Sequence, residues 1–110
     1  MTEKELKYLS DILTAILLIE DFTSSLCTFE DYNHDLKTQS AVECQLGIIG
    51  EAVNKFEMLE SGIPIDNARK IVGFRNRLIH AYDAVDTSMV WAILKNYLAP
   101  LKEEIKSKLG

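Results

Sequence analysis

The sequence predicts an all-α fold, a four-helix up-and-down bundle in a single domain spanning residues 1–110. Three observations predict it. Apolar residues recur at spacings of three and four along most of the chain, which is the period of a helix with one buried face. No stretch alternates apolar and polar residues as a half-buried strand does. Only two Pro and five Gly interrupt the chain, and its 47% hydrophobic residues can supply one core.

The first helix is expected to begin at Thr2, because Thr2 and Glu5 have the spacing of a capping box. It should end between Asp21 and Ser24, where Thr and Ser cluster. Its apolar face consists of Leu6, Leu9, Leu13, Ile16 and Leu17. The sequence leaves open whether Ser25 to Asn33 adds a short extra turn.

A second, longer helix is expected from Leu36 to about Leu59. One apolar stripe holds Val42, Leu46, Ile49, Val53 and Phe56, and a neighbouring stripe holds Ile48, Ala52 and Leu59. This arc is wider than one contact needs, so the helix should touch two neighbouring helices or a second subunit. Gly47 and Gly50 would let another backbone approach closely. Ser61 to Pro64 should end the helix.

The third and fourth helices each have capping residues and an apolar face. Asp66 is a suitable N-cap for a helix from Asn67 to His80. Asp86 to Ser88 offers caps for a last helix that runs to about Lys108. Pro100 lies inside that helix and lacks a backbone N–H, so we expect a kink there.

Charge is distributed unevenly along the chain. The net charge of −5 argues against nucleic-acid binding over the whole surface, because phosphates would be repelled from most of it. The segment from Asn67 to Tyr82 differs, since it holds Arg69, Lys70, Arg75 and Arg77 and no Asp or Glu. Any contact with RNA or DNA is therefore expected on this strip.

Several other classes of protein are disfavoured. No apolar run approaches the roughly 18 residues of a membrane span. The charged start, Met1 to Glu5, lacks the apolar core of a signal peptide. Cys27 and Cys44 match no metal-ligand spacing and are expected to be small core or semi-buried thiols. We expect a cytoplasmic protein that does not contact membranes.

Four residues of the basic strip carry chemistry: Arg75, Asn76, His80 and Tyr82. Cations near a helix C-terminus also offset the helix dipole, so charge alone does not indicate a site. The set nevertheless suits RNA cleavage without a metal or cofactor. His80 could take the proton of a ribose 2′-OH, Arg75 could neutralise the phosphoryl charge, and Asn76 could position the phosphate. DNA lacks the 2′-OH and should not be cleaved.

Helical geometry constrains this set. Asn76 and His80 are four positions apart and share a face. Arg75 and His80 are five apart, so their directions differ by roughly 140°. Either the long Arg75 side chain reaches round, or a second copy of the chain completes the site. No metal site competes, because His34 and His80 are the only histidines and no carboxylate pair repeats at ligand spacing.

The motif Arg75-x-x-x-x-His80-x-Tyr82 resembles the signature of HepT toxins in the HEPN superfamily. Three segments extend the resemblance in the expected order: Ile48 to Val53, Phe74 to His80, and Val85 to Trp91. One departure is Ala81, where many relatives carry a polar or acidic residue.

The resemblance implies properties that residue spacing cannot show. Members of this family are helical homodimers with a composite ribonuclease site between two motif helices. They are paired with a nucleotidyltransferase antitoxin that transfers AMP to the motif tyrosine. By resemblance, Tyr82 is the AMP acceptor, and its modification would place negative charge where RNA phosphate must lie.

Two supporting residues and an alternative function remain. Glu51 either orients Arg75 or Arg77, assists at the cleft, or is an ordinary solvent-facing acid, and Arg77 is expected to pair with an acid or with the dimer mate. Trp91 and Tyr97 are expected in the core or an interface. The sequence favours an endoribonuclease toxin. The alternative is a non-catalytic helical partner that docks a nucleotidyltransferase or binds its substrate.

Overall fold

The computed structural model describes residues 1–59, 63–80 and 86–110, and all regular structure in these ranges is helical. The elements are α1 (Glu3–Phe22), α2 (Phe29–Asn33), α3 (Leu36–Glu57), the 3₁₀ turn η1 (Asp66–Ala68), α4 (Arg69–His80), α5 (Thr87–Asn96) and α6 (Leu98–Leu109). The predicted all-α fold is confirmed. Within the same ranges, no helix has both the length and the apolar character needed to cross a membrane.

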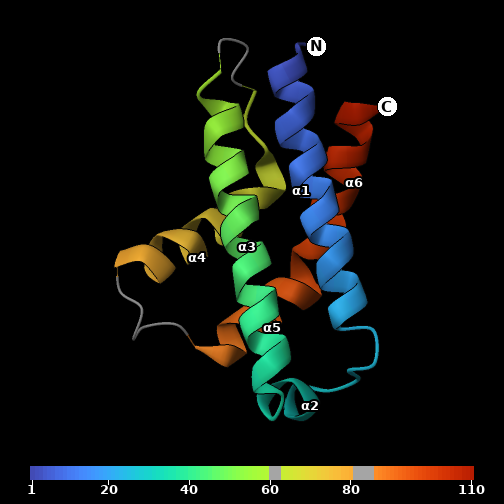
Figure 1. The fold of residues 1–110 in the computed structure, drawn as a ribbon, viewed down its shortest axis with the longest axis vertical. Helices are drawn as coiled ribbons and strands as arrows, with labels where there is room; N and C mark the ends of the chain where they lie inside the picture. The colour runs from blue at the N-terminus through green and yellow to red at the C-terminus, as the bar shows by residue number, and fades with distance from the viewer. Residues whose placement is uncertain (60–62, 81–85) are drawn as a thin grey trace.

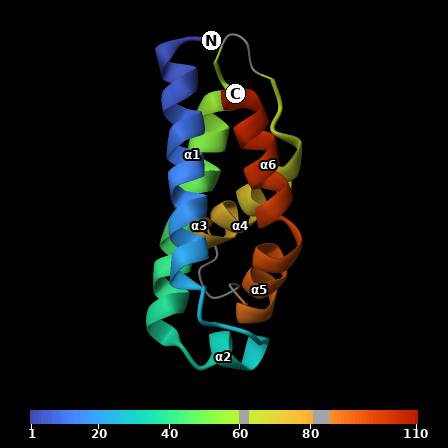
Figure 2. The same cartoon turned by 90° about the vertical axis from the view of Figure 1, so that its right-hand side faces the viewer.

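The two long helices, α1 and α3, form the largest interface and run in opposite directions (Figure 1). α6 packs along α1, and α4 packs on α3 at a steep angle. Figure 2 shows α2 closing one end of the molecule, while the N- and C-termini lie together at the other end. This arrangement leaves α4 as the helix that projects from the side of the bundle.

Thr2 begins α1 as predicted. Its side chain accepts a hydrogen bond from the Glu5 backbone N–H, and the Glu5 carboxylate accepts one from the Thr2 N–H, so the capping box is confirmed. The core between α1 and α3 is fully buried and includes Leu9, Ile12, Ile16, Ile19, Val42, Leu46, Ile49 and Val53. Burial of each such side chain stabilises the fold by about 1.5–3 kcal/mol.

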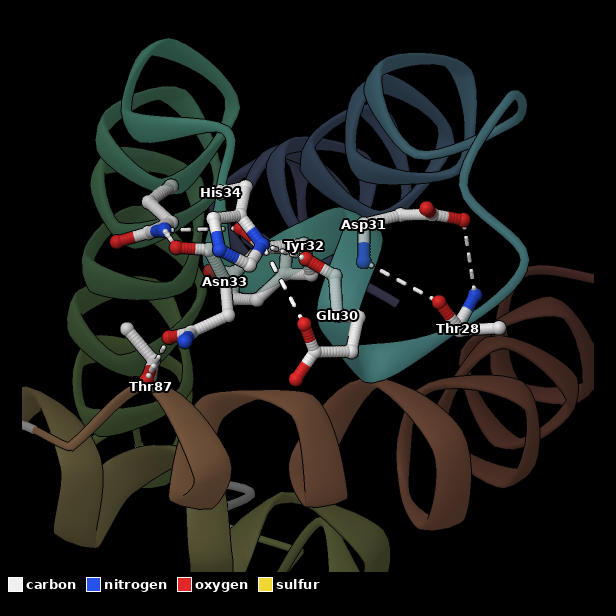
Figure 3. A network of polar contacts seen from close by, with 8 residues as sticks. Thr28, Glu30, Asp31, Tyr32, Asn33, His34 and Thr87 are labelled. Atoms are coloured by element: carbon white, nitrogen blue, oxygen red, sulfur yellow. Dashed lines mark hydrogen bonds and ion pairs between the residues drawn. The ribbon is translucent and has the colours of Figure 1, made fainter.

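The short helix α2, which the sequence left open, ties three elements together (Figure 3). The Gln39 side-chain amide, from α3, donates to the carbonyls of Tyr32 at 2.8 Å and Asn33 at 3.1 Å. At the start of α5, the Thr87 hydroxyl donates to the Asn33 side chain at 2.9 Å. These bonds hold the beginning of α5 against the α2–α3 corner.

The last predicted helix is two helices, α5 and α6, which meet at Tyr97. Pro100 explains the position of the break, because a proline ring clashes with the carbonyl four residues earlier, here that of Asn96. Pro100 itself lies in the first turn of α6, where its missing N–H costs little. Of the three caps that the sequence offered, Asp86 is the one that begins α5, accepting from the Ser88 N–H at 2.9 Å.

Asp66 is not the N-cap of the third long helix, contrary to expectation. Ile65 occupies the N-cap position of η1 without a side-chain hydrogen bond, and α4 follows directly. Glu104 of α6 does the capping instead. Its carboxylate accepts from the backbone N–H groups of Asp66 at 3.0 Å and Asn67 at 2.9 Å.

The expectation for the cysteines was wrong, because Cys27 and Cys44 are both exposed. Cys44 follows the core residue Val42 by two positions in α3, which turns it roughly 200° away from the α1-facing side. Cys27 lies in the turn before α2, where its N–H bonds to the Asp31 carboxylate.

Candidate functional site

The site is built where α4 crosses α3 at Gly50. A Cβ atom at Gly50 would lie 2.6 Å from the Cβ of Arg75 and 2.9 Å from its Cγ, closer than side chains tolerate. At Gly47 the nearest atom is the Cδ2 of Leu78, at an ordinary 3.6 Å. The predicted close approach is therefore confirmed, and Gly50 is the residue that requires it.

Arg75 turns toward α3 at this crossing. Its Nη2 donates to the carboxylate of Glu51, and its Nη1 donates to the Oδ1 of Asn76 at 3.3 Å. The Arg75 side chain is 23% exposed and that of Glu51 is 45% exposed. Glu51 also contacts Lys55, whose Nζ lies 3.5 Å away. The structure thus brings Arg75, Asn76 and Glu51 together, with the guanidinium half-buried and held in one direction.

The remaining motif residues are separate from this cluster. Arg77 lies toward α5, where its Nη1 approaches the Sδ of Met89 at 2.8 Å, and it forms no ion pair with any described residue. His80 ends α4 and is described by its backbone alone. Tyr82 lies outside the described residues.

Sequence reasoning missed a second pair between the same two helices. Arg69 donates through both terminal nitrogens to Glu57, each at 3.0 Å, and Glu57 also accepts from the Ile65 N–H at 2.8 Å. One signal could have revealed it. The two acids and the two arginines are each six positions apart and pair in reverse order, so both helices offer matching charges at two points.

A groove of about 520 Å³ between α4 and α5 was also missed. Its lining residues are Arg69, Lys70, Gly73, Phe74, Arg77, Met89, Ala92, Ile93, Asn96 and Tyr97. A second hollow, of about 440 Å³, lies between α1, α3 and α4 beside Glu51. The first groove is bordered by cations, so the basic strip has two sides: one faces α3 and the other faces α5.

The polar groups along α4 are suited to bind anions. Arginine and lysine are donors only, and an amide can add one further donor. Among the residues that the structure describes, no three His, Cys, Asp or Glu side chains are placed to share a metal ion. The arrangement can therefore hold a phosphate with guanidinium and amide donors.

The sequence profile of the ribonuclease HepT-like family matches residues 12–107. The chain belongs to this family. It is 46% identical over 99 residues to a probable ribonuclease HepT of Thermococcus cleftensis, covering 86% of each chain. Two proteins of Methanocaldococcus jannaschii named as candidate RNases are also similar. One is 35% identical over 98 residues, covering 87% of this chain and 80% of its own, and the other is 31% identical over 108 residues, covering 96% and 92%. No solved structure matches the chain significantly.

Family membership confirms the HepT resemblance, and the match covers all of α3, α4 and α5. It includes the close crossing at Gly50 and the whole HepT motif from Arg75 to Tyr82. The individual roles of Arg75, Asn76, His80 and Tyr82 remain predictions.

Proposed function

We propose that the chain is a metal-independent endoribonuclease of the HepT type, with Arg75, Asn76 and His80 as its catalytic residues. The observation that carries the proposal is the half-buried Arg75 guanidinium, held by Glu51 where α4 crosses α3. Family membership and the names of the similar proteins support the same activity.

The proposed reaction is an internal transfer at phosphorus. His80 takes the proton of a ribose 2′-OH, the 2′ oxygen attacks the adjacent phosphorus, and the bond to the 5′ oxygen breaks. The 5′ oxygen takes up a proton, leaving a 2′,3′-cyclic phosphate and a 5′-hydroxyl. Arg75 neutralises charge on the phosphoryl oxygens. Because the Asn76 Oδ1 accepts from Arg75, its Nδ2 is the group that donates to the phosphate.

We propose that the active form is a homodimer. Arg75 points toward α3. His80 is five residues further along the same helix, and ideal helical geometry turns two such positions roughly 140° apart, which favours a site completed by a second chain. The hollow beside Glu51 is lined in part by Ile48, a large apolar residue that is 42% exposed, and by Leu78. A second copy would cover this apolar surface. A monomeric mass in sedimentation at micromolar concentration would contradict the composite site.

We further propose that the protein is the toxin of a toxin–antitoxin pair and that a nucleotidyltransferase antitoxin silences it by transferring AMP to Tyr82. The position of Tyr82 two residues after His80 supports this assignment. AMP would add bulk and negative charge next to the phosphate site. Tyr82→Phe should keep ribonuclease activity and escape inhibition. Inhibition of this variant by AMP transfer would show that the acceptor is another residue.

The decisive experiment incubates end-labelled RNA with the purified protein in EDTA and compares wild type with His80→Ala. Cleavage by wild type alone, leaving 2′,3′-cyclic phosphate ends, is the expected result. If protein shown by mass spectrometry to carry no AMP fails to cleave total cellular RNA, the proposal fails. The better explanation of the basic strip would then be that the protein is a non-catalytic partner that docks a nucleotidyltransferase.

A further inference from the structure

We propose that the groove between α4 and α5 binds a nucleotide of the RNA strand next to the cleaved bond. The inference rests on the proposed ribonuclease function and adds a second binding element, on the side of α4 that faces away from Glu51. The groove volume of about 520 Å³ is within the range of pockets that hold small ligands.

The charge around the groove selects an anion. Among the described residues that line the groove, none is Asp or Glu, although acids outnumber cations in the chain, 17 to 12. Arg69 is engaged by Glu57. Lys70 and Arg77 are exposed and form no ion pair with any residue that the structure describes. Within the described part of the chain, two cations thus border the groove without an acidic partner.

The spacing of these cations suits a chain of phosphates. Lys70 and Arg77 are seven positions apart in α4, so they lie two turns, or about 10.5 Å, apart along one side of the helix. A single inorganic phosphate would contact one of them at a time. A nucleic-acid strand lying along the groove can contact both.

The other wall of the groove suits a base. Phe74 and Ile93 are buried beneath it, and Met89 and the half-buried Tyr97 add apolar and aromatic surface. Asn96 offers an amide at the same wall, with two donors and an acceptor for a base edge. Proteins that bind single-stranded RNA combine aromatic side chains with cations. Any of the four bases can stack on an aromatic ring, and the cations contact the phosphates.

The groove also connects to the proposed catalytic position. Arg77 and His80 are three positions apart in α4, and such positions are neighbours on a helix. Arg75 lies on the side facing α3. A strand whose reacting phosphate lies at the motif can therefore continue past Arg77 into the groove, which would anchor the adjoining nucleotide.

The test measures binding without cleavage. A fluorescein-labelled, fully 2′-O-methylated RNA 8-mer cannot be cleaved by 2′-OH attack, and fluorescence anisotropy gives its Kd over a range of salt concentrations. For single strands, each phosphate contact contributes about 0.7 to the slope of log K against log salt. We expect the double variant Lys70→Ala/Arg77→Ala to lower this slope by about 1.4 and to raise Kd at least tenfold at low salt.

Three further variants sharpen the result. Lys70→Ala alone should produce half of the slope change. Asn96→Ala should raise Kd about fivefold and leave the slope unchanged, because its amide would contact a base. Lys4→Ala removes the same charge from an exposed position on α1, outside the groove, and should bind like wild type. Lys70 and Arg77 are exposed, so thermal unfolding should confirm that the variants are folded.

An unchanged slope and Kd in the folded double variant would overturn the groove assignment. The parallel EDTA cleavage assay separates this failure from that of the proposed function. If wild type cleaves RNA but the double variant has the same salt slope as wild type, only the groove assignment fails. Groove-dependent binding by a protein that never cleaves RNA removes only the ribonuclease proposal.

Discussion

The two arginine–glutamate pairs between α3 and α4 look alike in sequence and differ in which partner is the more buried. In the Arg69–Glu57 pair the acid is the more buried partner, with its side chain 18% exposed against 56% for the arginine. In the Arg75–Glu51 pair the arginine is the more buried, 23% exposed against 45% for the acid. The same type of ion pair therefore holds an acid in place at the start of α4 and a cation in place near its middle.

The hydrogen bonds explain the difference. Glu57 also accepts from the backbone N–H of Ile65, a fully buried residue at the entry to η1, so it completes the fold. Glu51 shares its charge between Arg75 and Lys55, so it leaves the Arg75 charge incompletely neutralised. We therefore expect the Arg69–Glu57 pair to stabilise the fold and the Arg75–Glu51 pair to serve the proposed chemistry, and this assignment can be tested.

The largest expected effect comes from Arg75→Ala. Loss of a cation that neutralises developing phosphoryl charge should lower the cleavage rate roughly 100- to 1,000-fold. Glu57→Ala is the matched variant on the other pair. It should leave the rate of folded molecules within about twofold and lower the free energy of unfolding by about 2 kcal/mol, because the Ile65 N–H loses its acceptor. Single-turnover cleavage and urea unfolding measure both. The comparison breaks if Glu57→Ala slows cleavage as strongly as Arg75→Ala.

The second test changes the crossing that positions Arg75. Gly50→Ala places a Cβ against the Arg75 stem, and we expect it to destabilise the protein by about 1–3 kcal/mol. Gly47→Ala is the control in the same helix. Its new Cβ makes only ordinary contact, so the better helix propensity of Ala should stabilise the protein by up to about 1 kcal/mol. Thermal unfolding gives the sign of each effect. Equal shifts at the two glycines would show that the close approach is not the constraint.

Glu104 resembles Glu57, because it also holds backbone N–H groups at the entry to α4. Burial alone would raise its pKa, but the hydrogen bonds from the backbone N–H groups of Asn67 and Asp66, and from the Asn67 side chain, outweigh it and lower the pKa. A lowered carboxylate pKa contributes stability above the unfolded value, near pH 4.5, and loses it as the pH falls through the folded value. Glu104→Gln should therefore cost about 1–2 kcal/mol at pH 7 and progressively less toward pH 3. Urea unfolding at both pH values checks it, and a difference independent of pH would be evidence against a charged cap.

Local signals made the starts of α1 and α5 predictable. The capping box of Thr2 with Glu5 and the cap at Asp86 depend on residues within one turn, so the sequence displays them directly. From Pro100 we expected a kink within one last helix. The structure instead has two helices, because the clash of the proline ring falls four residues upstream and ends α5 there.

Contacts between distant elements were harder to foresee. Glu104 caps a turn 37 and 38 positions away, and no local pattern announces such a bond. The groove depends on the angle between α4 and α5, which the apolar period of either helix does not specify. At the candidate site, the Glu51–Arg75 contact was one of the sequence alternatives, whereas Arg77 lies against Met89 and pairs with no acid in the described part of the chain.

The smallest expected effect separates positioning from stability most directly. Glu51→Gln keeps the shape of the side chain and removes the charge that orients Arg75. Since the pair is partly exposed, the free energy of unfolding should change by less than about 1 kcal/mol. Losing the charge-assisted hydrogen bond should cost about 1 kcal/mol in the transition state, a roughly fivefold lower rate at saturating RNA with KM unchanged. Lys55→Ala removes the other partner of Glu51 and should leave the rate as it is. If the Glu51→Gln variant cleaves at the wild-type rate, Glu51 has only a structural role, as Glu57 does.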